Sequence, residues 1–248
     1  MRGVGKMKRA ILSFVLFAST FLIPFSNVGA SSVVDDILML QPDVSQEQLM
    51  ADVESIVSNT GMTENEVLDQ IYSELKNNQE KGMTEQAALQ KKGNSTFGGS
   101  GGTVSVGSST KGNFYYTPSE TAYLDHGHVG LYYASTTIVE SVPSDGVRQI
   151  STTARKVDSS GAVVKSVSTS TTNRNNAANW AYSQIGQSYS YNFATNRLTG
   201  HDGAKNCSKL IWSAYKLHGN LDLDVDGGLG VYPRDVRDAP GTVLVRNI

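Results

Sequence analysis

The chain has 248 residues, a formal net charge of −2 and a single cysteine. This length accommodates one globular domain with an appended segment. The sequence has no basic excess, which argues against a nucleic-acid-binding protein, so no nucleic acid is expected as a partner.

The first 30 residues have the pattern of a secretory signal peptide. Four Lys and Arg residues precede the apolar run "AILSFVLFASTFLIPFS", and the segment ends in a small residue, Ala30. Pro24 interrupts a run that is already short for a bilayer, and no stop-transfer pattern follows. We therefore predict a secreted protein, extracellular or associated with the cell wall, without stable membrane insertion after signal removal. Loss of the four basic residues takes the formal net charge from −2 to −6.

Residues 31–92 are predicted to form an acidic helical hairpin. Ser45 with Gln48, and Thr63 with Glu66, have the spacing of capping boxes, and apolar residues at helical intervals follow each pair. The region contains 12 acidic and 4 basic side chains. Such a region ahead of a less acidic domain is either a pro-segment that covers a site or a solvated spacer.

The remainder of the chain is predicted to be a linker followed by one domain. Residues 93–113 are rich in Gly and Ser, which is typical of a flexible linker. From residue 114, segments such as "HVGLYYA" and "TTIVESV" indicate strands, and the patterns "NRNNAANWAYSQIG" and "NCSKLIWSAYKLHG" indicate two later helices. Strands followed by helices, without strict alternation, indicate an α+β domain over residues 114–248.

Cys207 stands in the first turn of the second of these helices, directly after Asn206. Exported proteins use cysteines in pairs, so a single thiol indicates intermolecular pairing or a reactive group, unless it is a small buried hydrophobe. The N-terminus of a helix stabilises a thiolate, and its free N–H groups can also bind an oxyanion. The position therefore favours a nucleophilic cysteine.

A thiol nucleophile requires a base, and the chain offers four histidines. His128 lies where a glycine-containing turn enters a strand, so its side chain can project from the sheet onto a packed helix. His126 is expected in the turn, and His201 is a looser candidate in a glycine-flanked loop. His218 lies about 16 Å along the cysteine's own helix, too far to act. From position alone, His128 is the best placed candidate for the base, and His201 stays open as a looser one.

Glu140, in the following strand, is the predicted orienting residue for that base. If the two strands form a hairpin that turns near residues 133–136, His128 lies opposite residue 140 or 142. Glu140 is then a direct or diagonal neighbour of His128 on the same face. A carboxylate on a buried face needs a partner, whereas on the open face of an edge hairpin it would be an ordinary surface residue. The spacing leaves both interpretations open.

The order of the motifs resembles the circularly permuted NlpC/P60 cysteine hydrolases, the YiiX/YebB-like branch. In this chain "GHVGLYY" precedes "IVES", "GQSYSYNF", "NCSKLIWSAY" and "YPRDV", so the resemblance covers roughly 120–240. It implies a papain-like α+β fold in which a helix that carries the nucleophile packs on a small antiparallel sheet that carries the base. In the permuted branch the histidine strand precedes the cysteine helix, as it does here.

The resemblance also implies a role for each matched residue. Cys207 is the nucleophile, His128 the base and Glu140 the orienting residue. Tyr189 matches the tyrosine of the family that contributes to the oxyanion site, with Tyr191 as a near alternative. The family often has an acidic residue two positions after the cysteine, where this chain has Lys209, and this departure leaves the substrate in doubt.

The activity implied by the resemblance is amide hydrolysis without a cofactor, on a peptide of the cell wall (peptidoglycan). Two alternatives are open. The first keeps the fold but acts on lipids or other small amides, or transfers the acyl group. The second is a non-catalytic module that binds the cell wall.

Two further patterns are similar to metal sites. "DHGH" could supply Asp125, His126 and His128, but no second ligand pair supports it. "DLDVDGG", at 222–228, begins like an EF-hand loop, yet the position of the closing glutamate is occupied by Pro233. We reject the EF-hand interpretation and leave a weak surface calcium site open.

Overall fold

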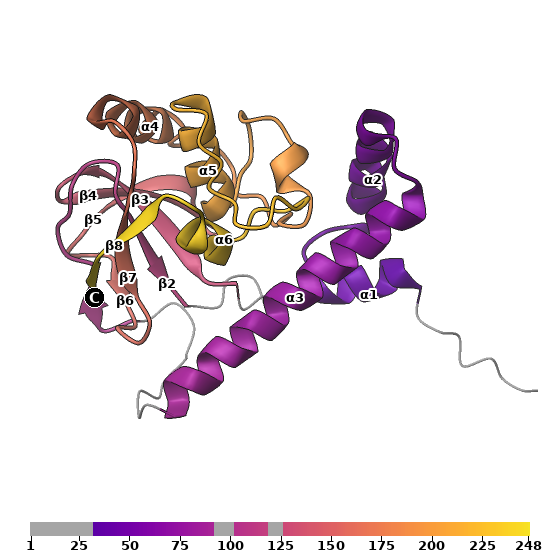
Figure 1. The fold of residues 1–248 in the computed structure, drawn as a ribbon, viewed down its shortest axis with the longest axis horizontal. Coiled ribbons are helices and arrows are strands. Elements are labelled where there is room, and N and C mark those ends of the chain that lie inside the picture. Colours follow the sequence, from indigo (N-terminus) through magenta and orange to yellow (C-terminus); the bar gives the residue numbers. More distant parts are fainter. Residues whose placement is uncertain (1–31, 92–101, 119–125) are drawn as a thin grey trace, which may run out of the picture. The chain divides into compact units, whose positions relative to one another are not determined.

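The computed structural model describes residues 32–91, 102–118 and 126–248 (Figure 1). The predicted signal peptide, residues 1–30, lies outside the described residues. All described residues belong to one compact unit. Within these ranges, every helix is too short or too polar to cross a bilayer.

The N-terminal part of the unit contains three helices: α1 (Val33–Leu40), α2 (Gln46–Thr60) and α3 (Glu64–Lys91). The Ser45 hydroxyl accepts the N–H of Gln48 at 3.1 Å, as predicted. Thr63 and Glu66 cap α3 reciprocally, at 2.8 Å and 3.3 Å. The prediction of a two-helix hairpin is wrong in one respect, because it misses α1. That helix begins with a capping box in which an aspartate, Asp35, replaces the usual glutamate or glutamine.

The domain that follows is built on a six-stranded antiparallel sheet with the order β5-β4-β3-β2-β7-β8. Its strands are β2 (Phe114–Thr117), β3 (His128–Ala134), β4 (Thr137–Val142), β5 (Gly146–Ser151), β7 (Val163–Val167) and β8 (Thr242–Asn247). Two short strands, β1 (Val104–Ser105) and β6 (Lys156–Val157), form a separate antiparallel pair.

The predicted linker, 93–113, extends too far along the chain. Residues 92–101 lie outside the described residues, but those that follow belong to the domain: β1 pairs with β6 and Val106 is completely buried. The N–H of Gly112 donates to Tyr132 O at 2.8 Å. Gly107 and Gly112 have φ values of 74° and 83°, which only glycine adopts without strain. The glycines of this stretch therefore serve turns that lead into the sheet.

Helices cover one face of this sheet. α4 (Thr171–Ser183) and α5 (Cys207–Leu217) pack on each other and on β3, while the short α6 (Pro233–Asp238) contacts α5, β2 and β8 (Figure 1). A 3₁₀ turn, Asn196–Leu198, lies in the loop before α5. An antiparallel sheet with helices packed against it confirms the predicted α+β class.

Alternation along the strands divides the core in two. One set of strand residues clusters with apolar residues of α4 and α5; it contains Phe114, Val129, Leu131 and Val139. The alternate set forms a second cluster with β1 and β6; it contains Tyr115, Tyr132, Ile138 and Val164. Because side chains alternate between faces, His128 and Glu140 lie on the same side of their strands as Tyr132 and Ile138.

Acidic and amide side chains of the N-terminal helices accept hydrogen bonds from the domain. Gln41 Oε1 accepts the N–H of Phe193 at 3.2 Å. Asp52 Oδ2 accepts from the side chains of Asn192 and Thr195, at 2.5 Å and 3.0 Å. Further along, Glu74 accepts two loop N–H groups, those of residues 229 and 230. The helical segment therefore binds the domain through directed polar contacts, and not as a solvated spacer alone.

Candidate active site

Cys207 is the first residue of α5, and a network around Asn206 fixes this end of the helix. Asn206 Oδ1 accepts the N–H of Lys209 at 3.0 Å, which is an N-cap bond, and also accepts the Ser208 hydroxyl at 3.1 Å. The Asn206 amide donates to Asn192 O at 3.0 Å. The Cys207 side chain is completely buried. The thiol thus lies at the positive end of a helix whose start is held by the loop that carries Asn192.

His128 is the first residue of β3, where Gly127 brings the chain into the strand. Gly127 has a φ of 81°, and a Cβ there would lie 2.5 Å from the Tyr116 ring, so both the conformation and the packing require glycine. The turn between β3 and β4 lies at residues 135–136, and Leu131 pairs with Val139. This register makes residue 140 a diagonal neighbour of His128.

The imidazole of His128 joins Glu140 to Cys207. His128 Nε2 lies 3.0 Å from Glu140 Oε2. The Cys207 thiol interacts with the same imidazole, and since Nε2 faces the carboxylate, Nδ1 is the nitrogen left for the thiol. The structure therefore brings together the three side chains that the sequence selected from positions 12 and 67 residues apart.

Glu140 is completely buried and is surrounded by donors that the sequence analysis missed. The Tyr115 hydroxyl donates to Oε2 at 2.5 Å, and Arg155 Nε lies 3.0 Å from the same oxygen. Arg148 donates to Oε1 through Nε and Nη2, at 3.1 Å and 2.8 Å. Arg148 is the direct cross-strand partner of Glu140 on β5, so a hairpin register extended by one strand would have found it.

These contacts decide the charges of the site. Burial raises the pKa of the Glu140 carboxyl, but the hydrogen bond and charge of His128, the charge of Arg155 and the Tyr115 hydrogen bond together hold it below its ordinary value. Burial lowers the pKa of His128, but the charge and hydrogen bond of Cys207 and the hydrogen bond to Glu140 outweigh it, so the net pKa is raised. The arrangement favours an ionised carboxylate beside a protonated imidazole.

Tyr189 lies close to this group. Its hydroxyl is buried and has no hydrogen-bond partner among the described residues. Burial, followed by the charge of Cys207, raises the pKa of Tyr189 far above its usual range, so the hydroxyl remains a donor. The Tyr189 and Tyr191 rings meet edge to face at a centroid distance of 4.9 Å.

A cavity of about 380 Å³ lies between α2 and the loop that carries Tyr191. Two of its lining side chains, Asp43 and Asp52, are acidic. Asp43 also acts electrostatically on Tyr189, so this end of the cavity adjoins the site. The other lining residues are Val44, Ser45, Gln48, Ser190, Tyr191, Asn192 and Thr199.

The remaining histidines have other partners or positions. His126 Nδ1 lies 2.9 Å from Gly127 O, and its ring packs on Phe193 at 4.0 Å. Burial lowers its pKa to about 3, so His126 is neutral. His201 Nδ1 lies 2.9 Å from the Ser213 hydroxyl. His218 is the C-cap residue of α5, at the end opposite the thiol.

The sequence pattern "DHGH" is not supported as a metal site. Asp125 lies outside the described residues. In the parts of the chain that the structure describes, one cluster of side chains has the spacing of metal ligands, and it consists of three aspartates without a histidine. Lys209, the departure from the family pattern, donates to Thr199 O at 2.9 Å and lies 4.5 Å over the Trp212 ring. Its ammonium group is therefore engaged away from His128.

Comparison with known proteins identifies one family model and two proteins that are similar to this chain. The model of the permuted papain-like amidase enzymes of the YaeF/YiiX type matches residues 114–230. The uncharacterized protein YycO of Bacillus subtilis (strain 168) is 42% identical over 247 residues, which are 98% of this chain and 99% of YycO. The crystal structure of the metalloprotein YiiX from Escherichia coli O157:H7 is 16% identical with a TM-score of 0.42, over 56% of this chain and 97% of that one. A likeness at that level carries no argument about the site.

Proposed function

Because the chain belongs to the permuted papain-like amidase family, and is therefore an amide-hydrolysing enzyme, we propose that Cys207, His128 and Glu140 perform its reaction. The observation that carries this proposal is the position of the His128 imidazole, which interacts with Cys207 and lies 3.0 Å from Glu140. A nucleophile, a base and an orienting group in contact form the constellation that acyl transfer requires.

In the proposed first step, the Cys207 thiolate attacks the carbonyl carbon of the amide, and a carbon–sulfur bond forms. The oxyanion accepts hydrogen bonds from free N–H groups at the start of α5 and from the Tyr189 hydroxyl. His128, protonated at Nδ1, gives that proton to the leaving nitrogen as the carbon–nitrogen bond breaks. The amine departs and a thioester remains on Cys207.

In the second step, neutral His128 takes a proton from water at Nδ1, and the hydroxide formed attacks the thioester. The thiolate leaves, the acid is released and the imidazolium–thiolate pair is restored. Glu140 accepts the Nε2–H throughout. It thereby holds the tautomer in which Nδ1 is free to exchange protons with sulfur, nitrogen and oxygen.

We place this activity outside the cell, on a peptide of the cell wall. The support for export is the N-terminal segment with its basic start and apolar run. The support for a peptide substrate is the match to an amidase family, because a peptide chain is joined by amide bonds. Thiol chemistry of this kind needs no cofactor.

The test measures fragments released from purified cell walls by the wild type and by single variants. Cys207→Ala and His128→Ala should each reduce release by about 10³-fold or more while circular dichroism shows a native fold. His201→Ala is the matched control, because it removes a histidine that bonds to Ser213 outside the site. Full release by folded Cys207→Ala would overturn the proposed chemistry.

Parallel assays on acyl amides distinguish the substrates. Turnover of acyl amides with intact cell walls would assign the same site to a lipid or small-amide hydrolase, or to an acyltransferase if an added amine captures the acyl group. Cell-wall binding that is indifferent to both substitutions, without turnover of either substrate, would indicate a non-catalytic module.

We propose in addition that the N-terminal helices restrict access to the site. Cys207 is completely buried and His128 is 2% exposed, so a substrate cannot reach the thiol in this arrangement. The connection between α1 and α2 approaches the site, since Gln41 accepts the N–H of Phe193 and Asp43 acts on Tyr189. The segment would then act as a pro-segment.

A further inference from the structure

Three carboxylates gather at a place remote from the thiol chemistry. Asp224, Asp226 and Asp235 each offer an oxygen, and these oxygens lie within 4.8 Å of one another. Any three points no more than 4.8 Å apart share a centre at most about 2.8 Å (4.8 Å divided by √3) from each, and Ca²⁺–oxygen bonds measure about 2.3–2.6 Å. The spacing is therefore that of three oxygen ligands around one cation, after a shift of a few tenths of an ångström.

The state of Asp235 points independently to a ligand. The residue is 1% exposed, and its Oδ2 accepts the N–H of Tyr232 at 2.8 Å. Oδ1 is buried and has no hydrogen-bond partner among the described residues. A buried carboxylate oxygen without a donor is costly, and a cation is the partner that would satisfy it.

Two basic side chains already approach the cluster. Arg197 forms an ion pair with Asp224, and Lys81 of α3 lies 4.0 Å from Asp226. Two positive charges beside three carboxylates leave the cluster with an excess negative charge.

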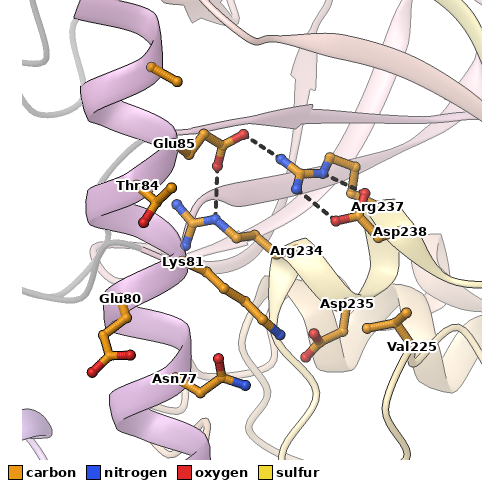
Figure 2. Close-up of a pocket in the computed structure, with 11 residues that line it drawn as sticks. Asn77, Glu80, Lys81, Thr84, Glu85, Val225, Arg234, Asp235, Arg237 and Asp238 are labelled. Carbon is orange, nitrogen blue, oxygen red and sulfur yellow. Dashed lines mark hydrogen bonds and ion pairs between the residues drawn. The ribbon is translucent and has the colours of Figure 1, made fainter.

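The cluster is also accessible. Asp226 is exposed, while Asp224 and Asp235 are buried, so the group opens to solvent on one side only. Asp235 lines a cavity of about 630 Å³ between α3 and α6, and Figure 2 shows Lys81 extending from α3 toward Asp235. A hydrated ion can therefore enter and retain water molecules as its remaining ligands.

The sequence explains why the three aspartates do not match the EF-hand pattern. Asp224 and Asp226 are the second and third aspartates of "DLDVDGG", but the first, Asp222, is drawn away into an ion pair with Arg197. The chain then supplies Asp235 from α6, two residues beyond the position of the closing glutamate. The ligands are thus taken from a loop and a helix in place of one 12-residue loop.

From this geometry we propose that Asp224, Asp226 and Asp235 bind one divalent cation of the calcium class. All three donors are carboxylate oxygens, and no nitrogen or sulfur ligand joins them among the described residues, so a hard cation is favoured over zinc. The site is independent of the proposed amidase chemistry. Bound cation would join the 222–228 loop to α6.

Calorimetric titration of the metal-stripped protein with CaCl₂ tests the proposal. One ion per chain should bind with a dissociation constant of about 10⁻⁴–10⁻³ M, as in extracellular calcium modules. Asp235→Asn should weaken binding at least about tenfold, because one full charge is lost while an oxygen remains to cap Tyr232. Thermal unfolding should shift upward with CaCl₂ in the wild type and much less in the variant.

Two further variants make the test decisive. Asp226→Asn changes an exposed ligand, so the fold should survive even if Asp235→Asn does not, and it should weaken binding similarly. Asp238→Asn is the matched control on α6, since Asp238 pairs with Arg237 and lies outside the cluster; its affinity should equal that of the wild type. Absence of binding at about 10 mM CaCl₂, or equal affinity in Asp226→Asn and wild type, would refute the site.

Discussion

The substitution Glu140→Gln separates two roles of this carboxylate, orientation of His128 and supply of negative charge. Oε2 faces three donors, Tyr115, His128 and Arg155, whereas Oε1 faces Arg148 alone. Glutamine has one acceptor oxygen, which should turn to the three donors. Its NH₂ group would then face Arg148, whose side chain is 31% exposed and keeps Asp145 as a partner. Orientation of His128 should therefore survive.

The magnitude follows from the lost charge. A hydrogen bond to a charged acceptor contributes about 1.5–3 kcal/mol, and one to a neutral acceptor about 0.5–1.5 kcal/mol. A difference near 1.4 kcal/mol at His128 corresponds to about a tenfold loss in kcat/KM. Glu140→Ala removes the acceptor entirely, so the tautomer is no longer held and a loss of about 10³-fold or more is expected. Alanine should also cost about 3–5 kcal/mol of folding free energy, since it leaves Arg155, whose side chain is only 15% exposed, without its carboxylate.

The pH dependence of kcat/KM reports how the charge of Glu140 affects the pKa of His128. Glu140 is one of the groups that raise the pKa of His128, and its charge is absent in Glu140→Gln. The imidazolium should then lose its proton at a lower pH than in the wild type. Because the protonated ring is the acid in the first step, activity on the alkaline side should fall at a lower pH in the variant.

Steady-state rates over a pH series, with thermal unfolding of each variant, provide the measurement. Equal kcat/KM for Glu140→Gln and Glu140→Ala would refute the argument that one oxygen preserves orientation. An alkaline limb that does not move in Glu140→Gln would show that the carboxylate charge does not act on the reacting imidazole.

Two further predictions concern the surroundings of the thiol. Tyr189→Phe should lower kcat about a hundredfold, because the tyrosine hydroxyl is a proposed donor to the oxyanion. Thermal stability should not fall, because this buried hydroxyl has no hydrogen-bond partner among the described residues. A comparable loss of kcat in Tyr191→Phe, and not in Tyr189→Phe, would assign the oxyanion role to Tyr191. Glu74→Ala removes two hydrogen bonds between α3 and the domain, so it should destabilise the fold by about 1–3 kcal/mol and raise kcat/KM severalfold. An unchanged rate in destabilised Glu74→Ala would show that the helices do not restrict access.

The parts of the site that are local in sequence could be predicted from it. Parity along one hairpin relates His128 to Glu140, and the cap at Asn206 marks the first residue of the cysteine helix. Both arguments need only residues within one hairpin or one turn. The meeting of His128 with Cys207 is different, because only the fold brings these positions together, and in the sequence analysis it rested on the resemblance to a family.

The donors around Glu140 illustrate why the rest was missed. Arg148 can be found by extending the hairpin register from β4 to β5. Tyr115 lies on β2, and its place beside β3 depends on the order of strands in the sheet. Arg155 lies in the turn between β5 and β6, and no periodicity in the sequence specifies its position. The linker prediction failed for a related reason. Composition reports glycine content, whereas the burial of Val106 and the pairing of β1 with β6 depend on contacts between residues 51 to 53 positions apart.

The same distinction governs the N-terminal helices, where the sequence left open both a pro-segment and a spacer. Their capping boxes depend on residues three apart and are visible in the sequence. Their attachment depends on contacts such as Asp52 with Asn192, separated by 140 residues. In such contacts, carboxylates of the helices accept hydrogen bonds from the domain. Some of the acidic residues that suggest a solvated surface in the sequence therefore bind the helices to the domain. Because acidic residues serve both purposes with the same composition, only the long-range contacts can separate a bound segment from a spacer.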